Sequence, residues 1–254
     1  MAINVKKEVE YLKRRYERVG NKKRAAWDKN YCRSIFKFYG VKGDDVKKII
    51  KQFIQKNKEL DKKDLWLLVR VLWESGYHEL RSTAVNLLRG YLKKLDYSDL
   101  PAIERLLRQA INWDQIDEIA VHLVGPILEK DQRAFSYLKK WSIDKNFWIR
   151  RAALLSQLFL FRKKQGDRQL FYRLAVKMMD ESWQNFDSWA GNHPEKMGRW
   201  FIRKTIGWVL REMSERWPEE IYNFLKTNRH KMSSLSFREG GRKLPLEYQK
   251  LLKV

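Results

Sequence analysis

The segment RWFIRKTIGWVLREMSERW, residues 199–217, carries apolar side chains at steps of three and four residues. This spacing predicts a helix with one buried face. The segment DLWLLVRVLWESG, residues 64–76, follows the same rule. Glycine (12) and proline (5) are scarce among the 254 residues, which favours helices over a turn-rich β fold. The sequence therefore predicts an all-α chain.

A short pattern within the first segment recurs along the chain and indicates how the helices are arranged. It reads aliphatic, charged, any residue, then two small or aliphatic residues, and its members are VKKII (46–50), LRSTA (80–84), IDEIA (116–120), IRRAA (149–153) and IRKTI (202–206). Their starts lie 34, 36, 33 and 53 residues apart. A period near 34 residues is typical of stacked helical hairpins. Because tetratricopeptide and ankyrin signatures are absent, we expect a HEAT-like α-solenoid, a right-handed stack of antiparallel helix pairs with a basic concave groove.

The long last interval predicts an insertion within a single domain that spans residues 1–254. Residues 183–199 contain Gly-Asn-His-Pro and lack a clean helical period, so we interpret them as an insertion loop. With Trp183, Trp189 and His193, this loop could contact a ligand or pack as a solvated elaboration. Residues 238–254 are predicted to form a basic C-terminal tail that begins with a Gly-Gly turn, where Arg238 could contact phosphate.

The charge of the chain favours a polyanionic partner. Lys and Arg number 54 against 31 Asp and Glu, which gives a net charge of +23. A field of this size attracts polyanions, and nucleic acid is the first candidate and an anionic membrane surface the second. A merely soluble or thermostable surface is the alternative, but such surfaces usually mix the two signs more evenly.

Several other classes of protein find no support in the sequence. Cys32 is the single cysteine, so a disulfide framework is excluded and a reducing compartment is expected. The N-terminus has no apolar signal region, and no apolar run is long enough to span a membrane. The four histidines lie far apart without metal-ligand spacing, so we expect no metal and no cofactor. A cytoplasmic, nucleoid-associated monomer is the expected form.

The second position of the recurring pattern is basic in four members and acidic in one. The residues there are Lys47, Arg81, Asp117, Arg150 and Arg203. If these positions line one face of the stack, Asp117 is a lone carboxylate in a basic ladder whose arginines hold phosphate. Asn112 is predicted to cap the helix that carries Asp117, and Gly125-Pro126 is predicted to end or kink that helix.

Aromatic and charged residues recur one helical turn apart, which is typical of a nucleic-acid interface. Trp113 and Asp117 are four residues apart and share a helix face, and the pairs Trp148–Arg151 and Trp208–Arg211 have similar spacing. Indole faces can support bases or sugars while guanidinium groups hold phosphate. Each Trp could instead be a wedge in the core, Arg211 could pair with a neighbouring Glu, and Asp117 could be buried against an Arg.

An ionised carboxylate on a DNA-binding face repels phosphate, so it is best explained if it meets a cation. Nearby basic groups favour the charged form of Asp117. A nucleoside that is losing its base develops positive charge on the sugar, and an alkylated purine is already cationic. Indole faces attract cations as well. The sequence therefore predicts cleavage of the glycosidic bond of a cationic base.

Four segments carry a resemblance to a known family. NWDQIDEIAVHLVGPIL (112–128), KNFWIRRAALLSQL (145–158) and FIRKTIGWVLRE (201–212) resemble motifs of the AlkD-like DNA alkylation repair family, and NYCRSIFKFYGV (30–41) is similar to its opening motif. The resemblance covers residues 10–245. It implies a HEAT-like DNA glycosylase, a hydrolase of base excision repair that removes N3- and N7-alkylated purines such as 3-methyladenine and 7-methylguanine from double-stranded DNA.

The resemblance also implies roles for individual residues. Asp117 matches the catalytic carboxylate, which stabilises the sugar cation and positions the attacking water. Trp113 and Trp208 match aromatics that pack on the nucleotide bearing the lesion, and Tyr31 matches an aromatic on the same face. Arg151 matches a DNA-contacting arginine opposite the carboxylate, and Arg211 falls within the same motif as Trp208. Apart from the resemblance, Arg150 and Arg203 of the recurring pattern and Arg238 of the tail are also expected to bind DNA.

Two other function classes stay open. One is a HEAT-like protein that binds damaged or branched nucleic acid without catalysis, and the other is a protein-interaction scaffold. The scaffold fits a net charge of +23 only if its partner is acidic. A lyase step is not expected, because it needs an amine nucleophile and no lysine occupies a matching position in the motifs.

Overall fold

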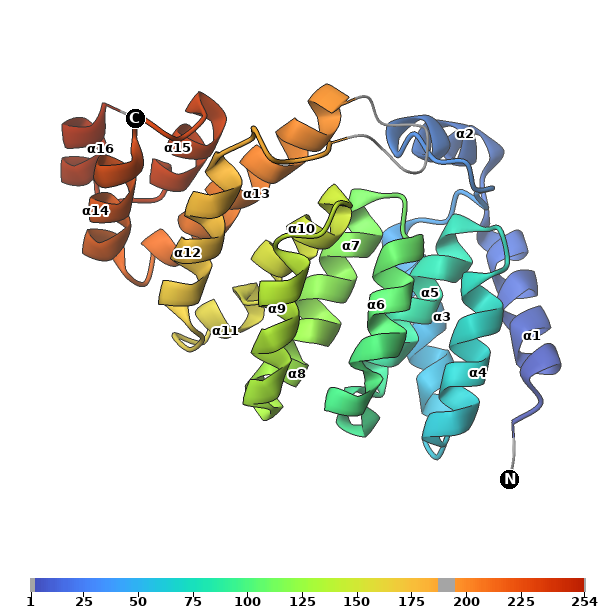
Figure 1. Ribbon diagram of the computed structural model, residues 1–254. Helices are drawn as coiled ribbons and strands as arrows, with labels where there is room; N and C mark the ends of the chain where they lie inside the picture. The colour runs from blue at the N-terminus through green and yellow to red at the C-terminus, as the bar shows by residue number, and fades with distance from the viewer. Residues whose placement is uncertain (1–2, 187–194, 254) are drawn as a thin grey trace. The chain divides into compact units, whose positions relative to one another are not determined.

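The computed structural model describes residues 3–186 and 195–253, and within them the regular structure is helical apart from an isolated β-bridge between Lys37 and Tyr77 (Figure 1). The all-α class predicted from the helical periodicity is confirmed. The helices form two compact units, Met1–Asp96 and Tyr97–Val254.

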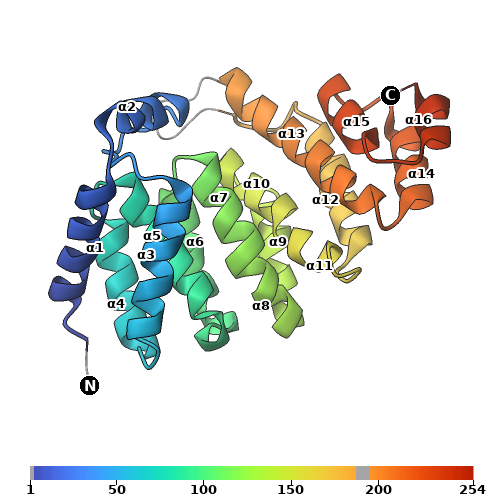
Figure 2. The same ribbon diagram turned by 180° about the vertical axis from the view of Figure 1, so that it is seen from behind.

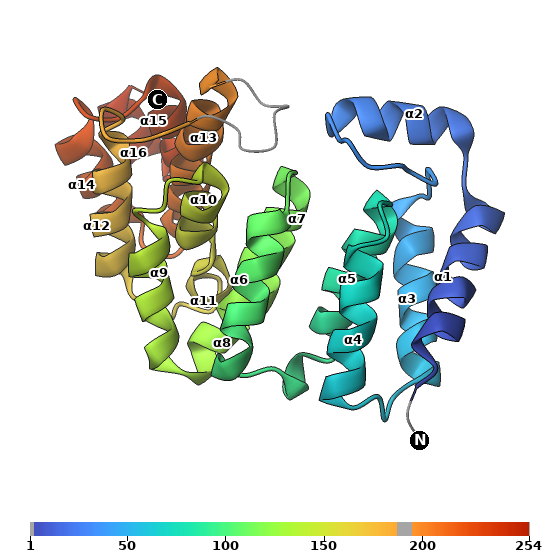
Figure 3. The same cartoon turned by 45° about the vertical axis from the view of Figure 1, so that its right-hand side comes forward.

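In the N-terminal unit, amphipathic helices pack side by side and a polar helix lies across one end of them (Figures 1 and 3). The packed helices are α1 (Val5–Val19), α3 (Gly43–Lys56), α4 (Lys62–Trp73) and α5 (His78–Gly90), followed by the short turn η1 (Leu92–Lys94). Their buried faces meet around Leu12, Phe53 and Leu68. The crossing helix α2 (Lys22–Tyr31) buries none of its residues.

A buried carboxylate fixes the loop that follows α2. Glu79 accepts hydrogen bonds from the backbone N–H groups of Tyr39, Gly40 and Val41 at 3.1, 2.7 and 3.3 Å. Gly40 has a φ of +74°, and a Cβ there would lie 2.1 Å from the carbonyl oxygen of Asn21, so only glycine fits. The N-terminal end of α2 is thus held against this loop, since the N–H of Asn21 also donates to the carbonyl of Tyr39 at 2.9 Å.

The C-terminal unit continues with stacked helices joined by short turns. Its elements are η2 (Tyr97–Asp99), α6 (Leu100–Gln109), α7 (Trp113–Ile119), η3 (Ala120–Val124), α8 (Gly125–Lys130), η4 (Gln132–Ala134), α9 (Phe135–Trp141), α10 (Phe147–Leu155), α11 (Leu158–Phe161), α12 (Arg168–Met179), α13 (Glu195–Ser214), α14 (Pro218–Asn228), α15 (Ser234–Gly241) and α16 (Leu246–Leu252). Helix α10 packs against α6, α7, α9 and α13, so it forms the centre of this unit.

Helices α7 and α8 form one continuous rod through the π turn η3, in contrast to the predicted end or sharp kink at Gly125-Pro126 (Figure 2). The N–H of Gly125 bonds to the carbonyl of Ala120, five residues earlier. Pro126 follows as the second residue of α8 and has no backbone N–H to donate to the preceding turn. The extra residue in the π turn therefore accommodates Pro126 without ending the helix.

Hydrogen bonds and ion pairs join residues of successive helix pairs, and these residues are separated by about the 34-residue period that the sequence predicts. Within the N-terminal unit, the Tyr91 hydroxyl donates to the carbonyl of Asn57, 34 residues earlier, at 2.6 Å. Within the C-terminal unit, the ion pairs Arg108–Asp144, Arg151–Asp117 and Lys163–Glu129 join residues 36, 34 and 34 positions apart. The stacking of neighbouring pairs thus reproduces the sequence period.

The two segments predicted to be irregular are more helical than expected. Helix α13 begins at Glu195, within the predicted loop 183–199, while Trp189 and His193 lie outside the described residues. In the predicted tail 238–254, Gly240 and Gly241 are buried at the end of α15 rather than in an open turn. A Cβ on Gly240 would lie 3.1 Å from Leu210 of α13, so the glycine is explained by close helix packing.

Candidate functional site

The carboxylate predicted to carry the chemistry lies on the second turn of α7 and is held by an arginine. The Asp117 side chain is 14% exposed. Arg151 donates from Nε to Oδ1 and from Nη2 to Oδ2, both at 2.8 Å. This is a two-point contact between matching planar groups, the strongest form of such a pair. The pairing with an Arg that the sequence left open is therefore present, and the carboxylate still reaches the surface.

Arg151 comes from α10, and each of its guanidinium nitrogens is used within the protein. Its Nη1 donates to the Phe201 carbonyl at 3.1 Å and to the Thr205 hydroxyl at 2.5 Å, both on α13, while the other two nitrogens hold Asp117. The side chain is 5% exposed. These contacts argue against the expected role of Arg151 as a DNA contact, because four of its five N–H groups are already engaged and the side chain is buried. Arg151 instead joins α7, α10 and α13 beneath the carboxylate.

The N-terminal end of α7 agrees only in part with the capping that the sequence predicts. Asn112 occupies the N-cap position as expected, but it makes no side-chain capping bond to the helix. Asp114 lies in the first turn, where the helix dipole favours negative charge. Asp114, Asp117 and Glu118 thus give this short helix an acidic face within a basic chain.

Burial raises the pKa of Asp117, and this effect is opposed by the positive charge and hydrogen bonds of Arg151. The negative charges of Asp114 and Glu118 raise it further. The sequence led us to expect only the lowering effect of basic neighbours. In the structure the pKa of Asp117 is raised instead, because the carboxylate is largely buried away from water.

The two tryptophans expected beside the carboxylate are both partly exposed. Trp113 begins α7 one turn before Asp117, and Trp208 lies on α13 one turn after Thr205, which contacts Arg151. Trp148 is different: it is fully buried, with its ring 4.6 Å from that of Phe201. The core alternative therefore holds for Trp148, while Trp113 and Trp208 keep surface that a ligand can contact.

Arg150, expected to bind DNA, is completely buried. It donates to the carbonyl oxygens of Asp144 at 2.6 Å, Lys145 at 3.1 Å and Asn185 at 2.6 Å. Burial lowers the pKa of Arg150 to about 10. These contacts argue against a phosphate contact, because a residue inside the unit cannot reach DNA. Arg150 instead ties the segment at Asn185 to the start of α10.

Two further arginines of the predicted DNA-binding set pair with buried or half-buried glutamates. Arg203 makes two contacts of 2.7 Å with Glu181, which also accepts from Arg199 at 3.0 Å. Arg211 pairs with Glu239 rather than with the expected neighbours on its own helix. The Arg203 side chain is 40% exposed and can face solvent, whereas that of Arg211 is 19% exposed.

The basic ladder is not a common surface. Lys47 is exposed, but Arg81 is buried, with its guanidinium carbon 3.7 Å from the Trp73 ring centroid. Arg238, from the predicted tail, is exposed on α15. The expected ladder is therefore wrong as a description of one face, because positions equivalent in sequence differ in burial.

Tyr31 lies in the N-terminal unit at the end of α2 and is 60% exposed. It stacks on Trp27, which is 61% exposed, with ring centroids 5.0 Å apart and an angle of 7° between the planes. The sequence reasoning missed Trp27, although the four-residue spacing could have indicated it. Stacked exposed rings on a basic helix provide a flat apolar surface.

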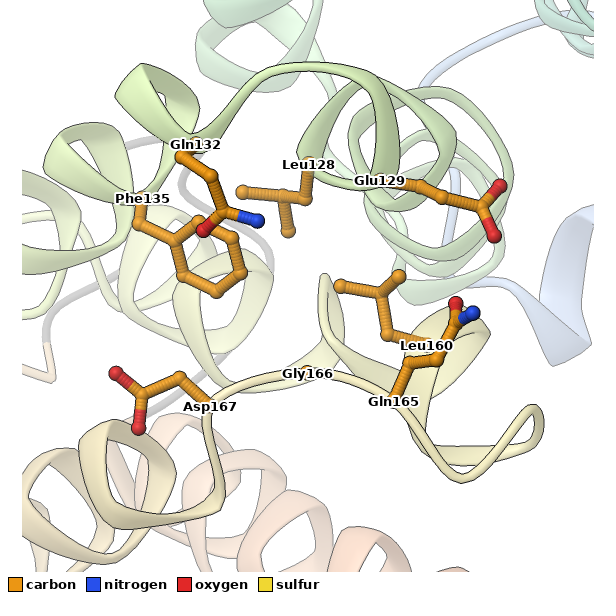
Figure 4. Close-up of a pocket in the computed structure, with 8 residues that line it drawn as sticks. All are labelled: Leu128, Glu129, Gln132, Phe135, Leu160, Gln165, Gly166 and Asp167. Carbon is orange, nitrogen blue, oxygen red and sulfur yellow. The ribbon is translucent and has the colours of Figure 1, made fainter.

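Other kinds of site receive no support in the described part of the chain. No three His, Cys, Asp or Glu residues there are grouped so as to hold a metal ion. In the same residues, no helix combines the length and the apolarity that a membrane crossing requires. A cavity of about 370 Å³ lies at the C-terminal end of α8 and contains none of the predicted site residues. Figure 4 shows the residues that line it, Leu128, Glu129, Gln132, Phe135, Leu160, Gln165, Gly166 and Asp167.

The chain is similar to a known protein family and to a solved structure. The family model described as DNA alkylation repair enzyme matches residues 12–244. A solved structure from Enterococcus faecalis, described as a predicted DNA alkylation repair enzyme, superposes with a TM-score of 0.74 at 22% identity, covering 89% of this chain and 97% of that one. A search of curated proteins yields no match. The chain therefore belongs to the DNA alkylation repair enzyme family, and its role is the enzymatic repair of alkylated DNA.

Proposed function

We propose that the protein is a monofunctional DNA glycosylase that hydrolyses the bond between deoxyribose and a cationic N3- or N7-alkylated purine, such as 3-methyladenine or 7-methylguanine, in duplex DNA. The observation that carries this proposal is the Asp117 carboxylate, which Arg151 holds by two hydrogen bonds while the Asp117 side chain stays 14% exposed. The family match supports a repair role, and the glycosylase chemistry rests on this residue.

The geometry leaves the carboxylate able to act on a substrate. Each carboxylate oxygen has two acceptor directions. Arg151 uses one on Oδ1 and one on Oδ2, so one on each oxygen remains for water or for a positively charged sugar. A fixed negative group in a partly dry setting stabilises a developing cation more than a solvated one does.

The reaction proceeds by loss of the base and addition of water. The C1′–N bond breaks, and both electrons leave with the alkylated purine, which departs as a neutral base because it carried a positive charge. The sugar becomes an oxocarbenium ion that Asp117 stabilises. Water then adds to C1′ and gives its proton to the carboxylate or to solvent. Selectivity follows from the leaving group, so neutral bases are poor substrates.

Aromatic residues contact the DNA. Trp113 and Trp208 support the nucleotide that bears the lesion, and the N-terminal unit contributes Tyr31 as a separate aromatic contact to DNA. Arg203 and Arg238 have exposed surface for phosphates, and the net charge of +23 supplies the long-range attraction. A cytoplasmic, nucleoid-associated monomer without a cofactor completes the proposal.

The test is base release by Asp117→Asn. Globally methylated duplex DNA is incubated with excess enzyme and the released bases are identified. We expect release to fall by about 100-fold or more while binding to the same DNA is kept, since the charge that stabilises the transition state is lost. Glu118→Gln is the matched control, because it removes a charge from the same helix but leaves Arg151 paired. Unchanged release by Asp117→Asn would remove the catalytic role.

A non-catalytic binder of damaged or branched nucleic acid is the second candidate. The observation in its favour is that Arg151 already supplies a cation to Asp117, as a structural ion pair would. In that case the wild-type protein binds methylated DNA and releases no base.

A further inference from the structure

Thr205 contacts the arginine that holds the carboxylate, and its hydroxyl has a fixed direction. The hydroxyl of Thr205 donates to the carbonyl of Phe201, four residues earlier on α13, at 2.6 Å. Its proton is therefore engaged, and its oxygen presents lone pairs to the Nη1 of Arg151 at 2.5 Å. Thr205 is completely buried, so water does not compete for this contact.

We infer that Thr205 is a positioning residue, which sets the place of the Asp117 carboxylate by fixing the guanidinium of Arg151. This inference rests on the proposed glycosylase function and adds a residue to it that touches neither DNA nor water.

The guanidinium group of Arg151 is held at two opposite edges. The edge formed by Nε and Nη2 holds the two carboxylate oxygens, so any rotation of the planar group moves both contacts together. On the opposite side, Nη1 is fixed by the Phe201 carbonyl and the Thr205 hydroxyl. Without the hydroxyl, the carbonyl is the only remaining partner for Nη1 among these contacts, and the group can turn about it. Through Arg151, Thr205 thus limits how far the Asp117 carboxylate can move.

The same contact links the carboxylate to the tryptophan expected across the site. Trp208 follows Thr205 by three residues on α13, so the two lie on neighbouring positions of one helix face. Arg151 therefore connects α7, which carries Asp117, to the part of α13 that carries Trp208. The relative position of the carboxylate and this indole depends on the Thr205 contact.

The experiment compares Thr205→Val, Thr205→Ser and Thr83→Val. Valine keeps the shape of threonine and removes the hydroxyl, while serine restores it. Thr83→Val is the matched control, because Thr83 is also completely buried and donates to the carbonyl four residues earlier, that of Glu79, at 2.7 Å, but lies in the N-terminal unit. Stability of all three variants is measured by urea unfolding.

For Thr205→Val we expect the rate constant for base release at saturating enzyme to fall by about tenfold or more, because small displacements of a reacting group are costly. Affinity for methylated DNA is expected to stay the same. The acid side of the pH–rate profile is expected to move to higher pH, because a less firmly held Arg151 lowers the pKa of Asp117 less. Thr205→Ser and Thr83→Val should release bases at the wild-type rate.

Two outcomes overturn the inference. In the first, Thr205→Val releases bases at the wild-type rate and with the wild-type pH profile. In the second, Thr83→Val loses as much stability as Thr205→Val and also loses as much of the rate. If the wild-type protein releases no base, the proposed function fails instead. The inference is then decided by the carboxyl ¹³C titration of Asp117 by NMR, which must shift to higher pH in Thr205→Val and not in Thr83→Val.

Discussion

Asp117 and Arg151 lie 34 residues apart in sequence and form a two-point ion pair in which each carboxylate oxygen accepts one N–H at 2.8 Å. The pair is asymmetric toward solvent, with the arginine 5% exposed and the aspartate 14% exposed. The arginine is therefore the more deeply buried partner, and the aspartate is the partner that keeps more exposed surface.

Removing both partners of the ion pair should destabilise the protein by less than the sum of the two single removals. Arg151→Met leaves a largely buried carboxylate without its cation, which costs about 3 kcal/mol or more. In Asp117→Asn/Arg151→Met neither charge remains, so the loss of stability should be smaller than the sum of the two single losses. Urea unfolding of the four proteins measures the coupling. Additive losses would mean that the pair is not an energetic unit, and base release should stay absent in the double variant.

Base release should depend on pH through Asp117. The ionised form is needed, and burial raises its pKa, so the rate should fall on acidification at a pH above the usual range of an aspartate. In Arg151→Met the opposing cation is absent, and the fall should begin at a still higher pH. The pH–rate profiles of the two proteins under single-turnover conditions test this. A profile that is flat down to the ordinary carboxylate range would contradict it.

The raised pKa of Asp117 also makes the stability of the folded protein depend on pH. A raised pKa means that the folded protein binds this proton more tightly than the unfolded chain does. The contribution of Asp117 to stability is therefore fully present below its unfolded pKa and is lost as the pH rises through the folded pKa.

Arg150 and Arg238 should respond in opposite ways to substitution. Arg150→Met leaves the carbonyls of Asp144 and Asn185 without their donor, so it should destabilise the protein by about 2–4 kcal/mol and leave the salt dependence of DNA binding unchanged. Arg238→Gln should preserve stability and reduce the slope of log K against log salt by about 1 if it contacts one phosphate. Urea unfolding and DNA titrations at several salt concentrations measure both. A reduced slope for Arg150→Met would mean that this residue reaches DNA after all.

Gly125→Ala should destabilise the rod formed by α7, η3 and α8. The added Cβ would lie 2.6 Å from the Cβ of Phe159 and 2.9 Å from the carbonyl oxygen of Ser156, so we expect a loss of about 1–3 kcal/mol. Gly43→Ala is the control, since a Cβ there meets nothing within 4 Å at the first position of α3 and should be neutral or stabilising. Thermal unfolding of the two variants gives the comparison. Equal stability would show that the helices can move apart without cost.

The fold class was accessible from the sequence because each helix pair repeats its own apolar pattern, and the ties 34 to 36 residues apart are the physical form of that repeat. The placement of Trp113 and Asp117 one turn apart on the same helix also followed from their spacing. The π turn before Pro126 did not, because a Gly-Pro pair predicts a break as readily as an accommodated proline.

The roles of the arginines could not be assigned in the same way. Arg150 and Arg151 are adjacent, and one step along a helix is about 100° of rotation. One therefore faces Asn185 and the other faces Asp117 and Thr205, which lie 34 and 54 residues away. Partners at such distances are fixed by tertiary packing, so two neighbouring arginines look alike in sequence and differ in the structure.

The segment that follows α12 is attached to two helices at once. Arg150 of α10 donates to the carbonyl of Asn185, and Glu181 accepts from Arg199 and Arg203 of α13. A displacement of this segment would therefore be felt both by the helix that carries Arg151 and by the helix that carries Thr205 and Trp208.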